Sequence, residues 1–214
     1  MKYEESRAFA QSLDQDDPLA RFRKQFNFPR DRNERTPVYF CGNSLGLQPR
    51  TAVDFVQNEL DNWQNFAVDG HFHSERPWIS YHQRAAPGFA TLTGSRESEV
   101  IAMNTLTVNL HLMMASFYRP TPKRRKIVIE SGAFPSDQYA AASQIRVRGY
   151  DPATDLLEWQ PPPGEMHLRI EDLEKMLQSE GDSVALLLLP GVQYYTGQVL
   201  LSLIHISEPT RLDL

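Results

Sequence analysis

The most constraining feature of the sequence is an unbroken β-branched run, Ile127-Val128-Ile129. Residues of this type favour extended backbone, and a run without polar alternation is typical of a strand buried on both faces. Such strands occur in parallel sheets that are covered by helices. The run therefore predicts an α/β protein in which this segment lies inside a mainly parallel sheet with flanking helices.

Strand-like and helix-like segments alternate around this run, which supports the same architecture. We expect further strands at residues 100–103, 156–159 and 184–189, all of which are apolar segments. Ligands of such sheets bind beyond the carboxyl ends of the strands. The residues that follow Met103, Glu130 and Leu189 are therefore the first candidates for a site.

Helices are predicted where apolar residues recur at spacings of three and four. One helix follows Pro49, and its expected core-facing residues are Val53, Val56, Leu60, Trp63 and Ala67. Another covers residues 105–118, and its expected buried side consists of Leu106, Leu110, Met113, Met114 and Phe117. We expect further helices over residues 81–92, 136–145 and 170–177, and one or two short helices before Asn27.

Composition narrows the class of protein. The 214 residues carry a formal net charge of -5, which argues against a nucleic-acid partner because such partners require a basic face. The single cysteine, Cys41, rules out a disulfide within the chain and suits a reducing compartment. No segment resembles a signal peptide or approaches the roughly 18 apolar residues of a membrane span. These features predict a cytoplasmic protein without a membrane partner.

A first candidate site follows Met103, where Asn104-Thr105-Leu106-Thr107 leads into a predicted helix. The unpaired amides and partial positive charge of a helix N-terminus bind phosphate readily, and the two threonines add hydroxyl groups. The alternative is plain capping of the helix by Asn104 or Thr105.

A second candidate follows Glu130, where Phe134-Pro135-Ser136-Asp137 opens the next helix. An aromatic ring at this position can stack on a planar ligand, while Ser136 or Asp137 can bond a ligand or cap the helix. Two neighbouring turns, one suited to phosphate and one to a flat ring, favour a nucleotide or pyridoxal phosphate.

A third candidate combines the turn at residues 42–46 with the loop at residues 70–78. His71 or His73 can act as acid, base or hydrogen-bond donor near neutral pH, although a loop histidine is more often merely exposed. No third ligand is spaced near them, so no metal site is predicted. The sequence also lacks the serine-hydrolase, P-loop and dinucleotide-binding motifs.

Taken together, these segments resemble the kynureninase family, specifically its N-terminal half. The matching strings occur in order over nearly all of residues 30–200, and they are residues 39–49, Gly70-His71, Arg76-Pro77-Trp78, residues 103–110, residues 133–137 and residues 195–198. The resemblance implies the aminotransferase-like fold of type I pyridoxal-phosphate enzymes and a homodimer. It assigns residues 1–50 to the small domain and the substrate-side turn, and residues 51–200 to the first part of the large cofactor-binding domain.

The implied activity is the hydrolysis of L-kynurenine, and of 3-hydroxy-L-kynurenine, to anthranilate or 3-hydroxyanthranilate and L-alanine. It belongs to tryptophan catabolism and, in some organisms, to NAD biosynthesis. By resemblance, Leu106 and Thr107 hold the phosphate of pyridoxal 5'-phosphate. Phe134 lies against its ring, and the wall is completed by Pro135, Ser136 and Asp137. Ser44 and His71 face the substrate. Pro190 departs from the pattern, because the family commonly has a small hydroxyl residue there.

No catalytic lysine is identified. The lysine that forms the Schiff base and the acidic partner of the pyridine nitrogen come later in this family than residues 195–198. The only lysine after Asp137 is Lys175, which is expected on a helix surface. Residues 201–214 resemble the translation of a sequencing adapter, so we expect them to be a non-native tail.

Three interpretations remain after this step. The first is an inactive fragment of a kynureninase. The second is another type I pyridoxal-phosphate enzyme, such as a cysteine desulfurase relative. The third is a non-catalytic α/β fragment, whose uncovered sheet edges and apolar faces would favour aggregation.

Overall fold

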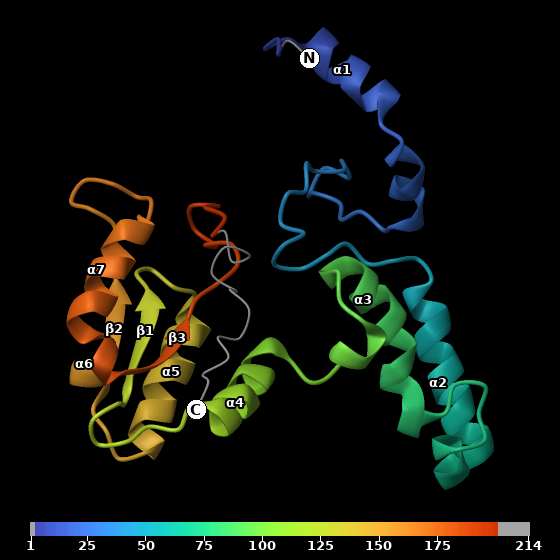
Figure 1. The fold of residues 1–214 in the computed structure, drawn as a ribbon. Helices are drawn as coiled ribbons and strands as arrows, with labels where there is room; N and C mark the ends of the chain where they lie inside the picture. Colours follow the sequence, from blue (N-terminus) through green and yellow to red (C-terminus); the bar gives the residue numbers. More distant parts are fainter. Residues whose placement is uncertain (1–2, 201–214) are drawn as a thin grey trace. The chain divides into compact units, whose positions relative to one another are not determined.

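The computed structural model describes residues 3–200, so the tail predicted at residues 201–214 lies outside the described residues. The chain divides into two compact units, Met1–Ala102 and Met103–Leu214. Figure 1 shows the helical first unit in colours from blue to green and the sheet-containing second unit in colours from light green, at α4 (Leu106–Phe117), to red.

The second unit contains a three-stranded parallel sheet. Its strands are β1 (Lys126–Glu130), β2 (Leu156–Trp159) and β3 (Val184–Leu188), in the order β2-β1-β3. Ile127 lies opposite Leu156 on one side and Leu186 on the other. The strands expected at residues 127–129, 156–159 and 184–189 are thereby confirmed, as is the α/β class with a parallel sheet.

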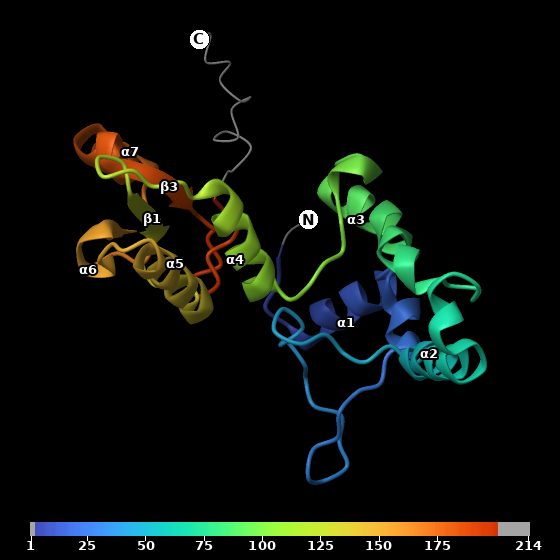
Figure 2. The same cartoon turned by 90° about the horizontal axis from the view of Figure 1, so that it is seen from below.

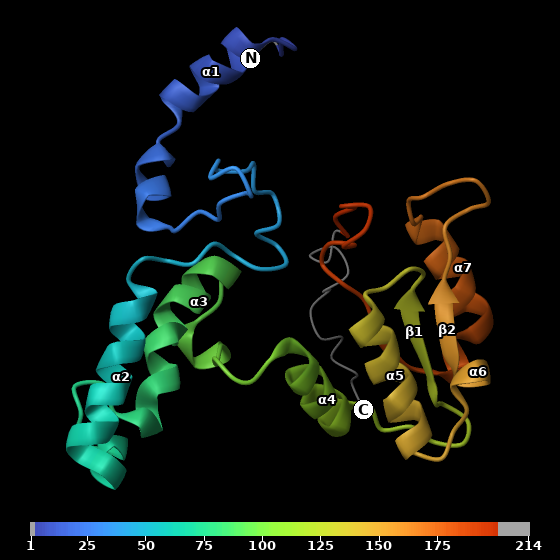
Figure 3. The same ribbon diagram turned by 180° about the vertical axis from the view of Figure 1, so that it is seen from behind.

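Helices cover both faces of this sheet, as Figures 2 and 3 show. They are α4 (Leu106–Phe117), α5 (Pro135–Val147), the single turn α6 (Pro152–Asp155) and α7 (Ile170–Glu180). A short 3₁₀ helix, Gly181–Ser183, leads into β3. Helices α4, α5 and α7 confirm the helices expected from the apolar spacing at residues 105–118, 136–145 and 170–177.

Successive residues of β1 serve two different cores, because side chains alternate across a strand. Ile127 packs with α4 and α5, in a cluster completed by Met114, Tyr118, Ala140, Ala141 and Ile145. Val128 points to the opposite face and packs with α7, in a cluster completed by Trp159, Leu168, Leu173 and Val184. The burial of β1 on both faces explains why its sequence shows no polar alternation.

A buried ion pair anchors the entry to the sheet. Asp155 is 1% exposed, and both of its carboxylate oxygens accept hydrogen bonds from Arg125 Nε, at 3.1 and 3.0 Å. Tyr118 donates its hydroxyl proton to the Arg125 carbonyl oxygen at 2.5 Å. The pair therefore links the turn before β2 to the residue before β1.

The first unit is built from helices and turns. They are α1 (Arg7–Asp16), α2 (Ala52–Phe66), α3 (Ala86–Thr93) and the 3₁₀ helices Ala20–Gln25, Ala67–His71, Trp78–Ala85 and Glu97–Glu99. The short helices expected before Asn27 and the helix expected after Pro49 are confirmed. The helix expected over residues 81–92 is only partly correct, because its first part is a 3₁₀ helix.

Three expectations about packing are wrong. Residues 100–103 form no strand, and Ile101 and Met103 are exposed. The expected core face of α2 is exposed, with Trp63 at 67%. On α4 only Met114 is fully buried and Leu110 is half-buried, whereas Leu106, Met113 and Phe117 are exposed. The periodicity identified helices correctly but did not identify which faces are covered within the described residues.

Among residues 3–200, no helix is both long and apolar enough to cross a membrane.

We predict that Ile145→Ala lowers the free energy of unfolding of the sheet-containing unit by about 2–5 kcal/mol. Ile145 is 0% exposed, so truncation leaves a cavity between α5 and β1. The matched control is Val147→Ala on the same helix, where the side chain is 76% exposed. Urea unfolding followed by circular dichroism measures both. Equal effects of the two substitutions would contradict the described packing.

Candidate functional site

The loops after β1 and β3 leave the sheet at the same end, because the two strands are parallel. Gln193 joins these loops and is 4% exposed. Its amide nitrogen donates to the Gly132 carbonyl oxygen at 2.9 Å. Its amide oxygen accepts from the backbone N–H groups of Tyr195 and Thr196, at 2.6 and 2.8 Å. One buried side chain therefore fixes the loop after β1 against the loop after β3.

The segment at residues 195–198 is a closed turn held by a second glutamine. Gln198 accepts from the Leu168 backbone N–H and donates to the Leu168 carbonyl oxygen, both at 2.8 Å. The Gln193 N–H donates to the Gln198 carbonyl oxygen at 2.8 Å, and Gly197 has a φ of 72°. A positive φ favours glycine at this position. The segment at residues 195–198 thus fixes the loop after β3 to the backbone of Leu168.

Phe134 stands at this end of the sheet as predicted, immediately before α5. Its ring is 50% exposed and meets the Tyr194 ring edge-on, with centroids 5.1 Å apart and an interplanar angle of 81°. A cavity of about 360 Å³ adjoins these loops and is lined by Ser131, Gly132, Pro161, Met166, Leu168, Gln193, Tyr194, Tyr195 and Thr196. Aromatic and apolar surface is therefore available to a flat ligand here.

Pro135, Ser136 and Asp137 form the first turn of α5. Pro135 occupies the first helical position, where its missing N–H costs nothing. Ser136 Oγ donates to Asp137 Oδ1 at 3.1 Å, and Phe134, the N-cap residue, makes no side-chain cap. Neither polar side chain caps the helix, so the capping alternative is not observed for this turn.

Glu130 is a buried carboxyl group at the end of β1, 4% exposed. Burial raises its pKa above the usual value, since the ionised form loses hydration; its own backbone N–H opposes this, and the Asp137 charge adds to the increase. The sequence pattern predicted a site after Glu130 but no role for Glu130 itself.

Leu106 and Thr107 lie in the first turn of α4, and both are exposed. The N-cap residue Thr105 has extended backbone and makes no side-chain hydrogen bond to the helix. By contrast, Ser6 caps α1 and Asp151 caps α6 through their side chains. The capping alternative therefore fails for Thr105, and the amides of this turn remain available to an anion.

Ser44 lies in an exposed turn of the first unit. Its backbone N–H donates to the Cys41 carbonyl oxygen at 2.9 Å, and the Tyr39 hydroxyl donates to the Leu45 carbonyl oxygen at 2.6 Å. The predicted tight turn is thus present. Gly42 and Gly46 have free space around a built Cβ and no positive φ, so no contact within the described residues requires glycine there.

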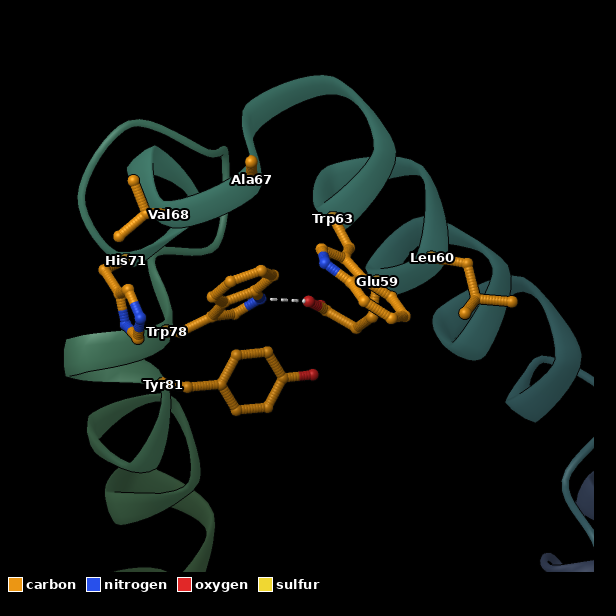
Figure 4. A pocket seen from close by; sticks show the side chains of 8 residues that line it. All are labelled: Glu59, Leu60, Trp63, Ala67, Val68, His71, Trp78 and Tyr81. Carbon is orange, nitrogen blue, oxygen red and sulfur yellow. Dashed lines mark hydrogen bonds between the residues drawn. The ribbon is translucent and has the colours of Figure 1, made fainter.

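His71 ends the 3₁₀ helix Ala67–His71 and lines an open cavity of about 830 Å³ in the first unit. Figure 4 shows it beside Trp78, with Glu59 and Trp63 on the opposite helix. The other lining residues are Leu60, Ala67, Val68 and Tyr81. His73 is exposed and is not among the lining residues. No group of three metal-ligating side chains occurs within the described residues.

The predicted site residues thus fall into two sets. The structure brings Phe134–Asp137 together with the loop at residues 190–200, and Leu106 and Thr107 belong to the same unit. Ser44 and His71 belong to the other unit, and their approach to the cofactor residues stays a prediction. No role was predicted from the sequence for Gln193, Tyr194 or Glu59. For Gln193 a signal existed, since an amide side chain directly follows Gly191-Val192 after an apolar strand.

A parallel sheet with helices on both faces places this chain in the α/β class, in which ligands bind beyond the carboxyl ends of the strands. The motifs on those loops are the ones that resemble kynureninases.

Comparison with curated proteins gives the same result. The chain is 50% identical to the kynureninase of Myxococcus xanthus (strain DK1622) over 196 residues, which is 92% of this chain and 46% of that protein. It is 48% identical to the kynureninase of Christiangramia forsetii over 199 residues, 93% of this chain and 47% of that protein. For the kynureninase of Nematostella vectensis the values are 45% over 204 residues, 90% and 44%. No family model matches the chain.

The chain therefore spans about half the length of the curated relatives it matches. The resemblance to kynureninases inferred from the motifs is confirmed over about nine tenths of the chain.

We predict that Glu130→Gln stabilises the protein relative to the unsubstituted chain as the pH rises. The folded-state pKa of Glu130 is raised, so its favourable contribution is complete below the unfolded pKa and is lost as the pH rises through the folded pKa. Glutamine does not ionise, so the difference in unfolding free energy should grow upward from about pH 4. Urea titrations at several pH values measure it, with the exposed Glu174→Gln as control. A pH-independent difference would contradict the buried position of Glu130.

Proposed function

We propose that this chain supplies part of the active site of a pyridoxal-phosphate-dependent enzyme that hydrolyses L-kynurenine and 3-hydroxy-L-kynurenine. The products are anthranilate or 3-hydroxyanthranilate and L-alanine. The observation that carries the proposal is the 45–50% identity to proteins named kynureninase from bacteria and an animal. Those names favour kynurenine hydrolysis over the activity of a cysteine desulfurase relative.

The residues present fit the cofactor. The first turn of α4 lacks a side-chain cap and presents Thr107 beside its free amides, which suits the phosphate group. The Phe134 ring is half exposed beside an apolar cavity, which suits the pyridine ring. When bound, pyridoxal phosphate supplies an electron sink for cleavage of a carbon–carbon bond. Leu106, Thr107 and residues 134–137 would hold it.

Ser44 and His71 are proposed to face the substrate. His71 opens on a cavity with aromatic walls, Trp63, Trp78 and Tyr81, which suits an aromatic ketone. An imidazole there can donate or accept a hydrogen bond near neutral pH. Pro190 is proposed to contact the cofactor more weakly than the small hydroxyl residue that the family commonly has at this position.

The lysine that holds the cofactor is proposed to lie outside this segment. Lys175 is 73% exposed on α7 and bonds Asp172 at 2.9 Å, so it is a surface ion pair. On this proposal the 214-residue chain alone does not catalyse the reaction.

The proposal also includes the type I aminotransferase-like fold, a homodimer and a cytoplasmic location. Residues 1–50 would belong to the small domain and residues 51–200 to the large one. The exposed apolar side chains of α2 provide surface that further chain or a second subunit can cover. A single exposed cysteine suits a reducing compartment.

The complete gene product is predicted to release anthranilate from L-kynurenine in the presence of pyridoxal phosphate, as measured by anthranilate fluorescence. Thr107→Val should weaken cofactor binding about tenfold or more, because a hydrogen bond to a charged group contributes about 1.5–3 kcal/mol. Thr91→Val is the control, since within residues 3–200 the Thr91 hydroxyl bonds only the Pro87 carbonyl oxygen of its own helix. Failure to release anthranilate with saturating cofactor would contradict the proposed activity.

A further inference from the structure

Trp78 connects the loop that carries His71 to helix α2. Its indole Nε1–H donates to Glu59 Oε2 at 2.8 Å, between residues 19 positions apart in sequence. Glu59 belongs to α2 and Trp78 opens the 3₁₀ helix Trp78–Ala85. Figure 4 shows this bond spanning the cavity wall. The hydrogen bond therefore holds the indole ring across two separate elements.

The same indole ring packs on the residues around His71. The His71 and Trp78 rings meet edge-on, with centroids 5.3 Å apart and an interplanar angle of 88°. A Cβ built on Gly70 would lie 2.9 Å from Trp78 Cη2, closer than real contacts permit. Gly70 is buried at this contact. Glycine at position 70 therefore allows the indole to sit directly against the backbone that carries His71.

The Glu59 carboxylate accepts a hydrogen bond from the Trp78 indole through Oε2. Its other oxygen, Oε1, is buried and has no hydrogen-bond partner within the described residues. A half-buried carboxylate that keeps a single good hydrogen bond depends strongly on that bond, because hydrogen bonds to charged groups are stronger than neutral ones. The position of the Trp78 ring thus depends on Glu59.

We propose that Glu59 and Trp78 are positioning residues that fix the orientation of the His71 imidazole in the lining of the cavity. Glu59 holds the indole, and the indole holds His71 over Gly70. The proposal rests on the proposed function only for the role of His71 as a substrate contact. The geometric part stands on the first unit alone.

Nuclear magnetic resonance of the 214-residue chain tests this without cofactor or substrate. The readouts are the Trp78 indole N–H signal and the His71 ring protons, assigned by loss of signals in Trp78→Leu and His71→Gln. Glu59→Gln keeps an acceptor for the indole, whereas Glu59→Leu removes it. The control is Gln64→Leu, an exposed position on the same helix.

In Glu59→Leu, the indole N–H should lose its downfield shift, and the His71 ring protons should move to their positions in Trp78→Leu. Glu59→Gln and Gln64→Leu should leave the His71 signals unchanged. Should Glu59→Leu fail to fold, Gly70→Ala decides, because its added methyl group pushes the indole away while Glu59 is intact.

Unchanged His71 signals in Glu59→Leu, or in Gly70→Ala if the former does not fold, would overturn the proposal and leave Trp78 a purely structural residue. An unchanged indole N–H in Glu59→Leu would overturn it as well. These outcomes are independent of kynurenine hydrolysis, so failure of the proposed function is measured separately.

Discussion

Strand β1 lies between β2 and β3 and pairs in parallel with both. These pairings place the loops that follow the three strands at the same end of the sheet, beyond the carboxyl ends of the strands. They also bury Ile127 and Val128 on opposite faces, each against different helices. The positions of α4, α5 and α7, and of the turns from which α4 and α5 start, follow from this packing. The candidate cofactor site therefore depends on the parallel pairing of β1.

Buried polar groups then shape the loops at this end of the sheet. Gln193 and Gln198 satisfy backbone groups that would otherwise lie unpaired beside the sheet, and each spans two segments. Leaving such groups unpaired costs about 1–3 kcal/mol each. Glu130 differs from these two glutamines, because its burial raises the pKa of its carboxyl group and so opposes ionisation. The loop that carries Phe134 is thus held from one side by an amide network, and it adjoins a carboxyl group that resists ionisation.

Sequence patterns predicted the sheet strands well where a neighbour exists to pair with them. The β-branched run gave β1, and the apolar segments at residues 156–159 and 184–189 gave its two partners. Residues 100–103 have similar composition but no adjacent strand within the described residues, and a strand without a ladder partner is not formed. An apolar composition indicates that a segment favours burial, whereas a strand forms only where a neighbouring strand can pair with it.

The same limit applies to the helices and to the site. Spacing predicted α2 and α4, yet Trp63 and Phe117 are exposed because periodicity does not specify what covers a face. Phe134 and the start of α4 were predictable because each lies at the beginning of a predicted helix, whereas the missing side-chain cap of α4 was not. The role of Glu59 was not predictable, since it arises from a hydrogen bond to Trp78, which is distant in sequence. For Gln193 the sequence showed an amide after an apolar strand but not its partner, Gly132.

On the proposed function, this chain carries the phosphate-binding and ring-stacking part of a pyridoxal-phosphate site. Titration of the ¹⁵N-labelled chain with pyridoxal phosphate, and in parallel with pyridoxal, is the decisive experiment. We expect saturable shifts of the Leu106 and Thr107 amides with pyridoxal phosphate alone, accompanied by shifts at Phe134. Shifts confined to Lys175, or no saturable change at α4 and α5, would contradict it.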